Sequence, residues 1–162
     1  MKLRHQLILK LSVLLSGVFL LIGNSSLTLA AGSGDSGASS ETPAVVVEAE
    51  KAIKKGQFDK AYEMLAAKES KYSKNADLYN LMGYSARKMQ RYDDSMAHYL
   101  RALEINPKHK GALEYIGELY LMLNQPDDAK AMLAKLEKVC FLGCDEKTEL
   151  AEAISAWEAQ NN

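Results

Sequence analysis

Small residues recur along this chain at intervals of 34 positions, and this period constrains the possible fold more than any other feature. The recurring residues are Ala49, Gly83, Gly117 and Ala151. We call a set of positions 34 residues apart a column. Four further columns hold Gly56, Gln90 and Asn124; Phe58, Tyr92 and Pro126; Ala61, Ser95 and Ala129; and Leu65, Tyr99 and Leu133. A period of this length is the sequence signature of stacked supersecondary units, each of which buries its apolar face against its neighbours.

Each 34-residue unit shows helical spacing twice. In the middle unit, a first helix carries Tyr79, Met82, Tyr84 and Ala86, and a second carries Tyr92, Ser95, Met96, Tyr99, Ala102 and Leu103. Pro107 ends the second helix, because proline disfavours the helical conformation of the residue before it. The small columns mark the points at which paired helices approach closely, where a bulky side chain would hold the backbones apart.

The pattern resembles the tetratricopeptide repeat, a family with an aromatic, Leu-Gly, Tyr, Ala, aromatic, Ala and Pro spread over 34 residues. Residues 76–109 match through Tyr79, Met82-Gly83, Tyr92, Ser95, Tyr99, Ala102 and Pro107, and residues 110–143 through Ile116-Gly117, Tyr120, Ala129 and Leu133. Residues 42–75 keep Ala49, Gly56, Phe58, Ala61 and Leu65 but depart at Glu48 and Ser73, as suits a terminal repeat with one side facing water. The resemblance implies an all-α fold, a right-handed α-solenoid of about three helix-turn-helix repeats with a C-terminal capping helix.

The capping helix is predicted over residues 145–160, which completes a repeat domain over 44–160. Leu150, Ala151, Ile154 and Trp157 lie on one face of such a helix, in phase with the repeats. Asp145 is placed to cap its start. Trp157 has two interpretations, a buried core residue of the cap or a binding residue, and the first is the more usual one for such a residue.

The first thirty residues are predicted to be a cleaved secretory signal peptide. Lys2, Arg4 and Lys10 form a basic leader, and the apolar run over 11–22 is shorter than the roughly 20 residues that a membrane anchor needs. Cleavage is expected near Ala30, with a flexible Gly/Ser-rich linker over 31–43.

The whole chain carries 20 Lys and Arg against 21 Asp and Glu, so removal of three basic residues leaves 17 against 21, a net charge of −4. We therefore expect a periplasmic or secreted protein without a stable membrane anchor, and no nucleic-acid partner.

The only two cysteines, Cys140 and Cys144, lie between the third repeat and the cap. In an exported protein so close a pair favours a structural disulfide, which would fix how the cap approaches the repeats. Copper binding and thiol exchange are the alternatives. Copper would require further soft or imidazole ligands, and neither His98 nor His109 is near the pair in sequence. We therefore predict no metal site and no cofactor, and we keep a periplasmic metal or redox accessory protein as the alternative function.

No catalytic motif is present: the chain has no Gly-rich phosphate loop, no His-Glu-x-x-His and no Gly-x-Ser-x-Gly. The paired acids Asp93-Asp94 and Asp127-Asp128 fall at the predicted start of second helices, where they complement the helix dipole. The chain is therefore predicted not to be an enzyme.

The resemblance places a peptide-binding groove on the concave face, which the first helix of each repeat lines. Carrying the family's columns over gives the predicted groove residues Val46, Glu50, Ile53, Asp77, Asn80, Tyr84, Arg87, Glu114, Glu118 and Leu121. The surrounding glutamates argue against a clamp for a terminal carboxylate. They favour a partner segment with Lys or Arg, anchored on Tyr84 and Leu121. The expected function is that of an exported adaptor or scaffold for the assembly or maturation of envelope or secreted proteins, with homo-oligomerisation left open.

Overall fold

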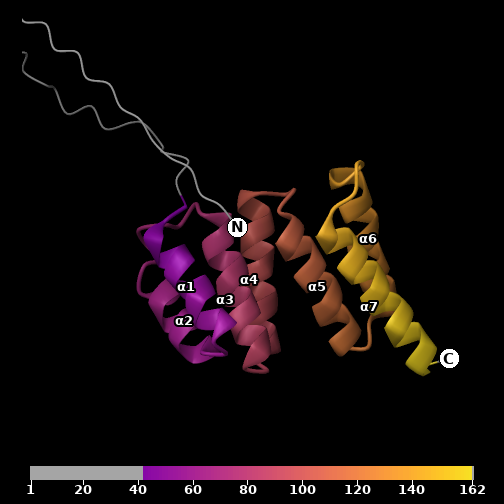
Figure 1. Ribbon diagram of the computed structural model, residues 1–162, viewed down its shortest axis with the longest axis horizontal. Helices are drawn as coiled ribbons and strands as arrows, with labels where there is room; N and C mark the ends of the chain where they lie inside the picture. The colour runs from indigo at the N-terminus through magenta and orange to yellow at the C-terminus, as the bar shows by residue number, and fades with distance from the viewer. Residues whose placement is uncertain (1–41, 162) are drawn as a thin grey trace, which may run out of the picture. The chain divides into compact units, whose positions relative to one another are not determined.

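The computed structural model describes residues 42–161, which form seven α-helices and no strands (Figure 1). The helices are α1 (Ala44–Lys54), α2 (Phe58–Ala66), α3 (Ala76–Lys88), α4 (Tyr92–Ile105), α5 (Lys110–Met122), α6 (Pro126–Val139) and α7 (Asp145–Asn161). The predicted signal peptide over 1–30 and all but the end of the predicted linker over 31–43 lie outside the described residues. None of the described helices is long and apolar enough to cross a membrane.

The helices pack as three pairs followed by a single cap. Each of α1, α3 and α5 contacts the helix that follows it, and α7 packs against α5 and α6. The first helices also contact one another in order, α1 with α3, α3 with α5, and α5 with α7, and we call these four the inner row. The second helices α2, α4 and α6 start at positions 58, 92 and 126, so the 34-residue step of the sequence is the step of the structure. The all-α solenoid predicted from the sequence is confirmed.

The turn inside each pair has the same backbone geometry in all three repeats. Gly56, Gln90 and Asn124 have φ of 73°, 61° and 60°, the left-handed conformation that ends a helix. In each turn the next residue's N–H reaches back to a carbonyl of the helix, as from Arg91 to the oxygen of Ala86 at 2.9 Å. Only the first of these turns uses glycine, so two repeats adopt a conformation that costs a side-chain-bearing residue free energy.

The three prolines lie at helix boundaries. Pro43 precedes α1, Pro107 follows the end of α4, and Pro126 is the first residue of α6, where its missing N–H is not needed. The prediction for Asp145 was wrong by one position. It is the first residue of α7 and not its cap, so it acts on the helix dipole from the first turn.

The small-residue columns lie where helices touch. A Cβ added at Gly83 would lie 2.6 Å from the ring of Tyr99 on α4, and one added at Gly117 would lie 2.5 Å from Leu150 on α7. Tyr99 and Leu150 are both completely buried. Glycine is required in both places because the neighbouring side chain fills the space that a methyl group would occupy.

Candidate functional site

The ten predicted groove residues all lie on α1, α3 and α5 of the inner row, but they differ in exposure. Glu50 and Asp77 are exposed, and Ile53, Tyr84 and Glu118 are partly buried. The remaining five are buried, namely Val46, Asn80, Arg87, Glu114 and Leu121. The columns of the sequence therefore place all ten residues on the first helices of the repeats, without distinguishing the side chains that a partner could reach.

Val46 belongs to the core and not to an open face. It is 1% exposed and belongs to the same apolar cluster as Ala49 and Leu65, against which Ile53 also packs. Residues of α1 that face α2 are covered by that helix, so Val46 is not available to a partner.

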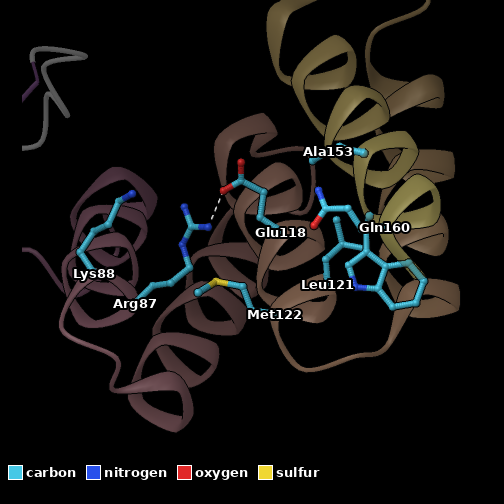
Figure 2. Close-up of a pocket in the computed structure, with 9 residues that line it drawn as sticks. Arg87, Lys88, Glu118, Leu121, Met122, Ala153 and Gln160 are labelled. Atoms are coloured by element: carbon cyan, nitrogen blue, oxygen red, sulfur yellow. Dashed lines mark ion pairs between the residues drawn. The ribbon is translucent and has the colours of Figure 1, made fainter. Parts of the chain in front are cut away.

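Arg87 is held by groups of this chain. Its guanidinium makes an ion pair with Glu118 (Figure 2) and lies over two aromatic rings, 5.4 Å from the centroid of Tyr84 and 5.3 Å from that of Tyr115. The side chain of Arg87 is only 8% exposed. A guanidinium that already has a carboxylate partner and two ring faces is less free to grip a terminal carboxylate.

Glu114 is buried beside other carboxyl groups. Burial raises its pKa to about 8, and a hydrogen bond with Glu149 and the charges of Glu118, Glu149 and Glu146 act in the same direction. Glu114 is therefore largely protonated at neutral pH. With Glu114 buried and Glu118 paired to Arg87, these two glutamates are less available to a basic segment, and a Lys- or Arg-bearing partner stays a prediction from the sequence.

A cavity of about 410 Å³ opens between the inner-row helices α3, α5 and α7 (Figure 2), and we call it the α5–α7 cavity. Its lining residues are Arg87, Lys88, Glu118, Leu121, Met122, Ala153, Ala156, Trp157 and Gln160. Leu121, Met122, Trp157 and the two alanines supply an apolar surface, and Arg87, Lys88 and Glu118 supply charge at one side. Met122 is 52% exposed, which is unusual for a large apolar side chain beside a cavity.

Three of the predicted groove residues, Arg87, Glu118 and Leu121, line the α5–α7 cavity, and the other seven do not. None of the predicted groove residues lies on α7, although four residues of this helix line the cavity. Trp157 is partly buried and packs against the core, and it also lines the cavity. The sequence feature that could have indicated the role of α7 is Trp157, a large aromatic residue near the end of an unpaired cap helix.

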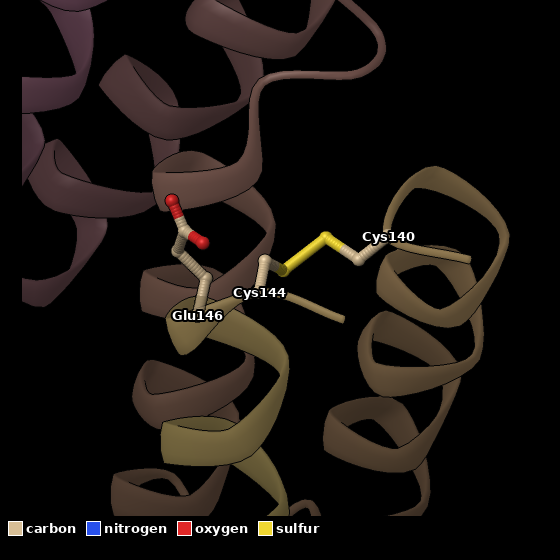
Figure 3. A group of neighbouring side chains, drawn as sticks. All are labelled: Cys140, Cys144 and Glu146. Atoms are coloured by element: carbon tan, nitrogen blue, oxygen red, sulfur yellow. A yellow bond between two sulfur atoms is a disulfide. The ribbon is translucent and has the colours of Figure 1, made fainter. Parts of the chain in front are cut away.

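The sulfur atoms of Cys140 and Cys144 lie 2.14 Å apart, at disulfide distance (Figure 3). A carboxylate oxygen of Glu146 lies near them, and the three possible ligand atoms are all within 4.8 Å of one another. Bonded sulfurs have no thiolate to offer a metal, so this group could bind one only after reduction. His98 and His109 are engaged elsewhere, with Tyr62 and with Asp77, at 3.0 Å in each case.

Two models of the tetratricopeptide repeat match the chain, over residues 76–109 and 98–131. A TPR repeat-containing protein of Methanocaldococcus jannaschii is 30% identical over 115 residues, which are 67% of this chain and 20% of that protein. The chain thus spans about a fifth of the length of this relative.

Solved structures with a similar fold include a Yersinia enterocolitica type III secretion chaperone in complex with a translocator peptide. Its TM-score is 0.63 at 14% identity, over 73% of this chain and 92% of that one. Another is the second TPR domain of a human protein in complex with an HSP70 peptide, with a TM-score of 0.59 at 18% identity, over 67% of this chain and 91% of that one. With the 34-residue period, the paired helices and the matching family models all in agreement, the chain belongs to the tetratricopeptide repeat family.

Proposed function

We propose that this protein is a non-enzymatic adaptor that binds a segment of a partner protein across α3, α5 and α7, with an apolar side chain of the segment in the α5–α7 cavity. The observation that carries the proposal is the cavity itself. It combines an apolar wall with a fixed ion pair, the arrangement in which an anchor gains affinity by burial and polar groups set its orientation.

A second feature of the inner row supports a bound segment. Asn80 is 8% exposed, and its Oδ1 atom has no hydrogen-bond partner among the described residues. A buried acceptor without a donor is costly, and the N–H of a bound segment would pair with it once the Asn80 side chain turns outward. The similar chaperone and TPR-domain structures were solved with peptides bound, which agrees with this kind of partner.

The predicted signal peptide indicates the cellular compartment in which this adaptor would work. If residues 1–30 direct export, the partner is an envelope or secreted protein whose assembly or maturation the adaptor assists. Cell fractionation combined with N-terminal sequencing of the purified protein tests this directly. A chain that begins near Ala31 in the periplasmic or secreted fraction is expected, and an uncleaved chain in the cytosol would contradict the export.

We also assign Cys140 and Cys144 to a structural disulfide, since the bond joins the end of α6 to the start of α7. The alternative is a metal or redox site, for which Glu146 is the one additional ligand near the pair within residues 42–161. Replacing both cysteines by serine separates the two. The structural role predicts lower stability with binding retained in the folded fraction, whereas the metal or redox role predicts lost activity at full stability.

Site-specific photocrosslinking in the native cell tests the binding site. A photoreactive residue at Met122 should capture a partner, and one at Leu100 should not, because Leu100 is similarly exposed but lies on α4, outside the inner row. Capture at 122 should fall when Trp157→Ala is added. Equal capture at both positions would contradict the site.

A further inference from the structure

The turn between α6 and α7 exposes two large apolar side chains side by side. Phe141 is 82% and Leu142 87% exposed, whereas no other exposed large apolar side chain described here exceeds 52%. They occupy residues 140–144, which we call the Phe141–Leu142 loop. Placing two such side chains in water is unfavourable, so a loop that does so is a strong candidate for a contact surface.

The loop is closed and locally ordered. Cys140 and Cys144 bridge its two ends (Figure 3), the N–H of Gly143 donates to the carbonyl of Cys140 at 2.8 Å, and Gly143 has φ of 93°. A short covalently closed loop loses little conformational freedom when it is bound, which favours association. Phe141 and Leu142 are therefore presented to a partner at low entropic cost.

The opposite end of the helix array carries an apolar cavity. A cavity of about 450 Å³, which we call the α1–α2 cavity, lies against α1 and the end of α2. Val45, Met64 and Tyr72 are among its apolar lining residues, and its charged lining residues are Glu48, Lys68 and Lys71. Its size is in the range of roughly 300–1,000 Å³ that accommodates compact ligands, so two adjacent side chains can enter.

Formal charge changes in one direction along the array. The first repeat (42–75) has seven lysines and five carboxylates, a net +2, and the middle repeat (76–109) has five basic and four acidic residues, a net +1. The third repeat (110–143) has four basic and five acidic residues, a net −1, and the cap (144–162) has one lysine and five carboxylates, a net −4. The two ends of the molecule are therefore opposite in net charge.

We propose that the Phe141–Leu142 loop of one copy of this chain docks into the α1–α2 cavity of a second copy, so that the molecules associate head to tail. Asp145 and Glu146, which follow the loop, then lie near Lys68 and Lys71 of the next copy. Such a contact uses two different surfaces, so each copy keeps one of each free, and association continues into a ring or a filament. The α5–α7 cavity takes no part in it and stays open to a partner segment.

The charges also disfavour a lipid surface as the occupant. The cap that carries the loop has a net charge of −4, and carboxylates beside the apolar pair are repelled by anionic headgroups. A basic cavity on another copy is attracted by the same carboxylates.

Sedimentation velocity on the purified chain over a concentration series tests the proposal. The wild type should associate, and Phe141→Ser with Leu142→Ser should raise the dissociation constant about tenfold or more, since it removes the buried anchor. Both side chains are exposed, so this variant should fold. Leu100→Ser, at another exposed apolar position, should associate like the wild type.

Two complementary variants test the head-to-tail geometry. The loop variant keeps its cavity, and Lys68→Glu with Lys71→Glu keeps its loop, so each alone should be monomeric and a mixture should form a 1:1 dimer that grows no further. A third variant, which carries Asp145→Lys, Glu146→Lys, Lys68→Glu and Lys71→Glu in one chain, should recover self-association, because both members of the charge pair are reversed.

Three outcomes would overturn the proposal. One is a wild-type chain that stays monomeric at every concentration, and another is association that the loop and lysine variants leave unchanged. The third is loop-dependent binding to vesicles of mixed neutral and anionic phospholipid without self-association, which would assign the loop to a membrane surface.

Discussion

Gly83 and Gly117 occupy the same column of the repeat, yet they receive different neighbours. Gly83 on α3 accommodates the ring of Tyr99 from α4, inside its own repeat. Gly117 on α5 accommodates Leu150 from α7, the cap. In each case an added Cβ would meet the neighbour at a distance shorter than van der Waals contact.

The difference shows how one repeated sequence serves two purposes. In the middle repeat the space beside the glycine is filled by a side chain from the second helix of the same repeat, so this contact stabilises the packing within the repeat. In the third repeat the corresponding space is filled by a side chain from the cap helix, so this contact attaches the cap to the last repeat. The cap also lines the α5–α7 cavity, so the stability of this second contact bears on the proposed binding site.

The largest effect is expected for Gly83→Ala. Its methyl group would overlap the Tyr99 ring, which is completely buried and cannot move aside without disturbing its neighbours. We expect a loss of about 3 kcal/mol in the free energy of unfolding, measured by urea denaturation. A loss below about 1 kcal/mol would show that the ring has room to shift and would remove the contrast between the two glycines.

Gly117→Ala should cost less, about 1–2 kcal/mol, because the methyl groups of Leu150 can rotate away from the added atom. Leu150→Ala alone should also destabilise, by about 2–4 kcal/mol, since Leu150 is fully buried. In the Leu150→Ala background, Gly117→Ala should cost almost nothing, whereas Gly83→Ala should cost as much as before. Additive losses for Gly117 and Leu150 would contradict the assigned contact.

The cap interface should also depend on pH. Burial and neighbouring carboxyl groups raise the pKa of Glu114 to about 8, from an ordinary value of 4.5. The folded state therefore holds a proton that the unfolded state releases, so stability is present at low pH and falls as pH rises from about 4.5 to 8. Urea denaturation at pH 5 and pH 8 should show a drop of about 1–2 kcal/mol that Glu114→Gln reduces. An equal drop in Glu114→Gln would assign the dependence to other groups.

The smallest effects are expected at the turns, where the middle and third repeats should behave alike. Gln90 and Asn124 have left-handed φ angles, so Gln90→Gly and Asn124→Gly should each stabilise the protein by about 0.5–1 kcal/mol. Gly56→Ala, in the same column, should destabilise it by a comparable amount. Thermal unfolding measures all three, and a destabilising Gln90→Gly would show that the side chain contributes more than the backbone strain costs.

The fold could be read from the sequence because the packing that stabilises it repeats. The close contacts at Gly83 and Gly117 and the starts of the second helices recur every 34 residues, so these positions are visible without a structure. The residues of the site were harder to predict from the sequence. Val46 and Glu114 belong to the same groove column, and this column is buried in every repeat. Its burial results from contacts between neighbouring helices, which the sequence pattern does not show.

The α5–α7 cavity was not predicted as a unit for a related reason. Its lining combines residues of α3 and α5 with residues of the cap helix α7, to which the sequence analysis assigned no groove residue. Met122 and Trp157 meet there from different helices, at positions that the columns did not assign to the groove.

The most direct measurement of the central claim is the affinity of the partner segment captured at position 122, determined by calorimetry with three forms of the chain. We expect Met122→Ser to bind about tenfold or more weakly than the wild type, and Leu100→Ser to bind like the wild type. Both side chains are about half exposed, so neither change should unfold the protein. Equal affinity for the wild type and Met122→Ser, or an equal loss in both variants, would contradict binding at the α5–α7 cavity.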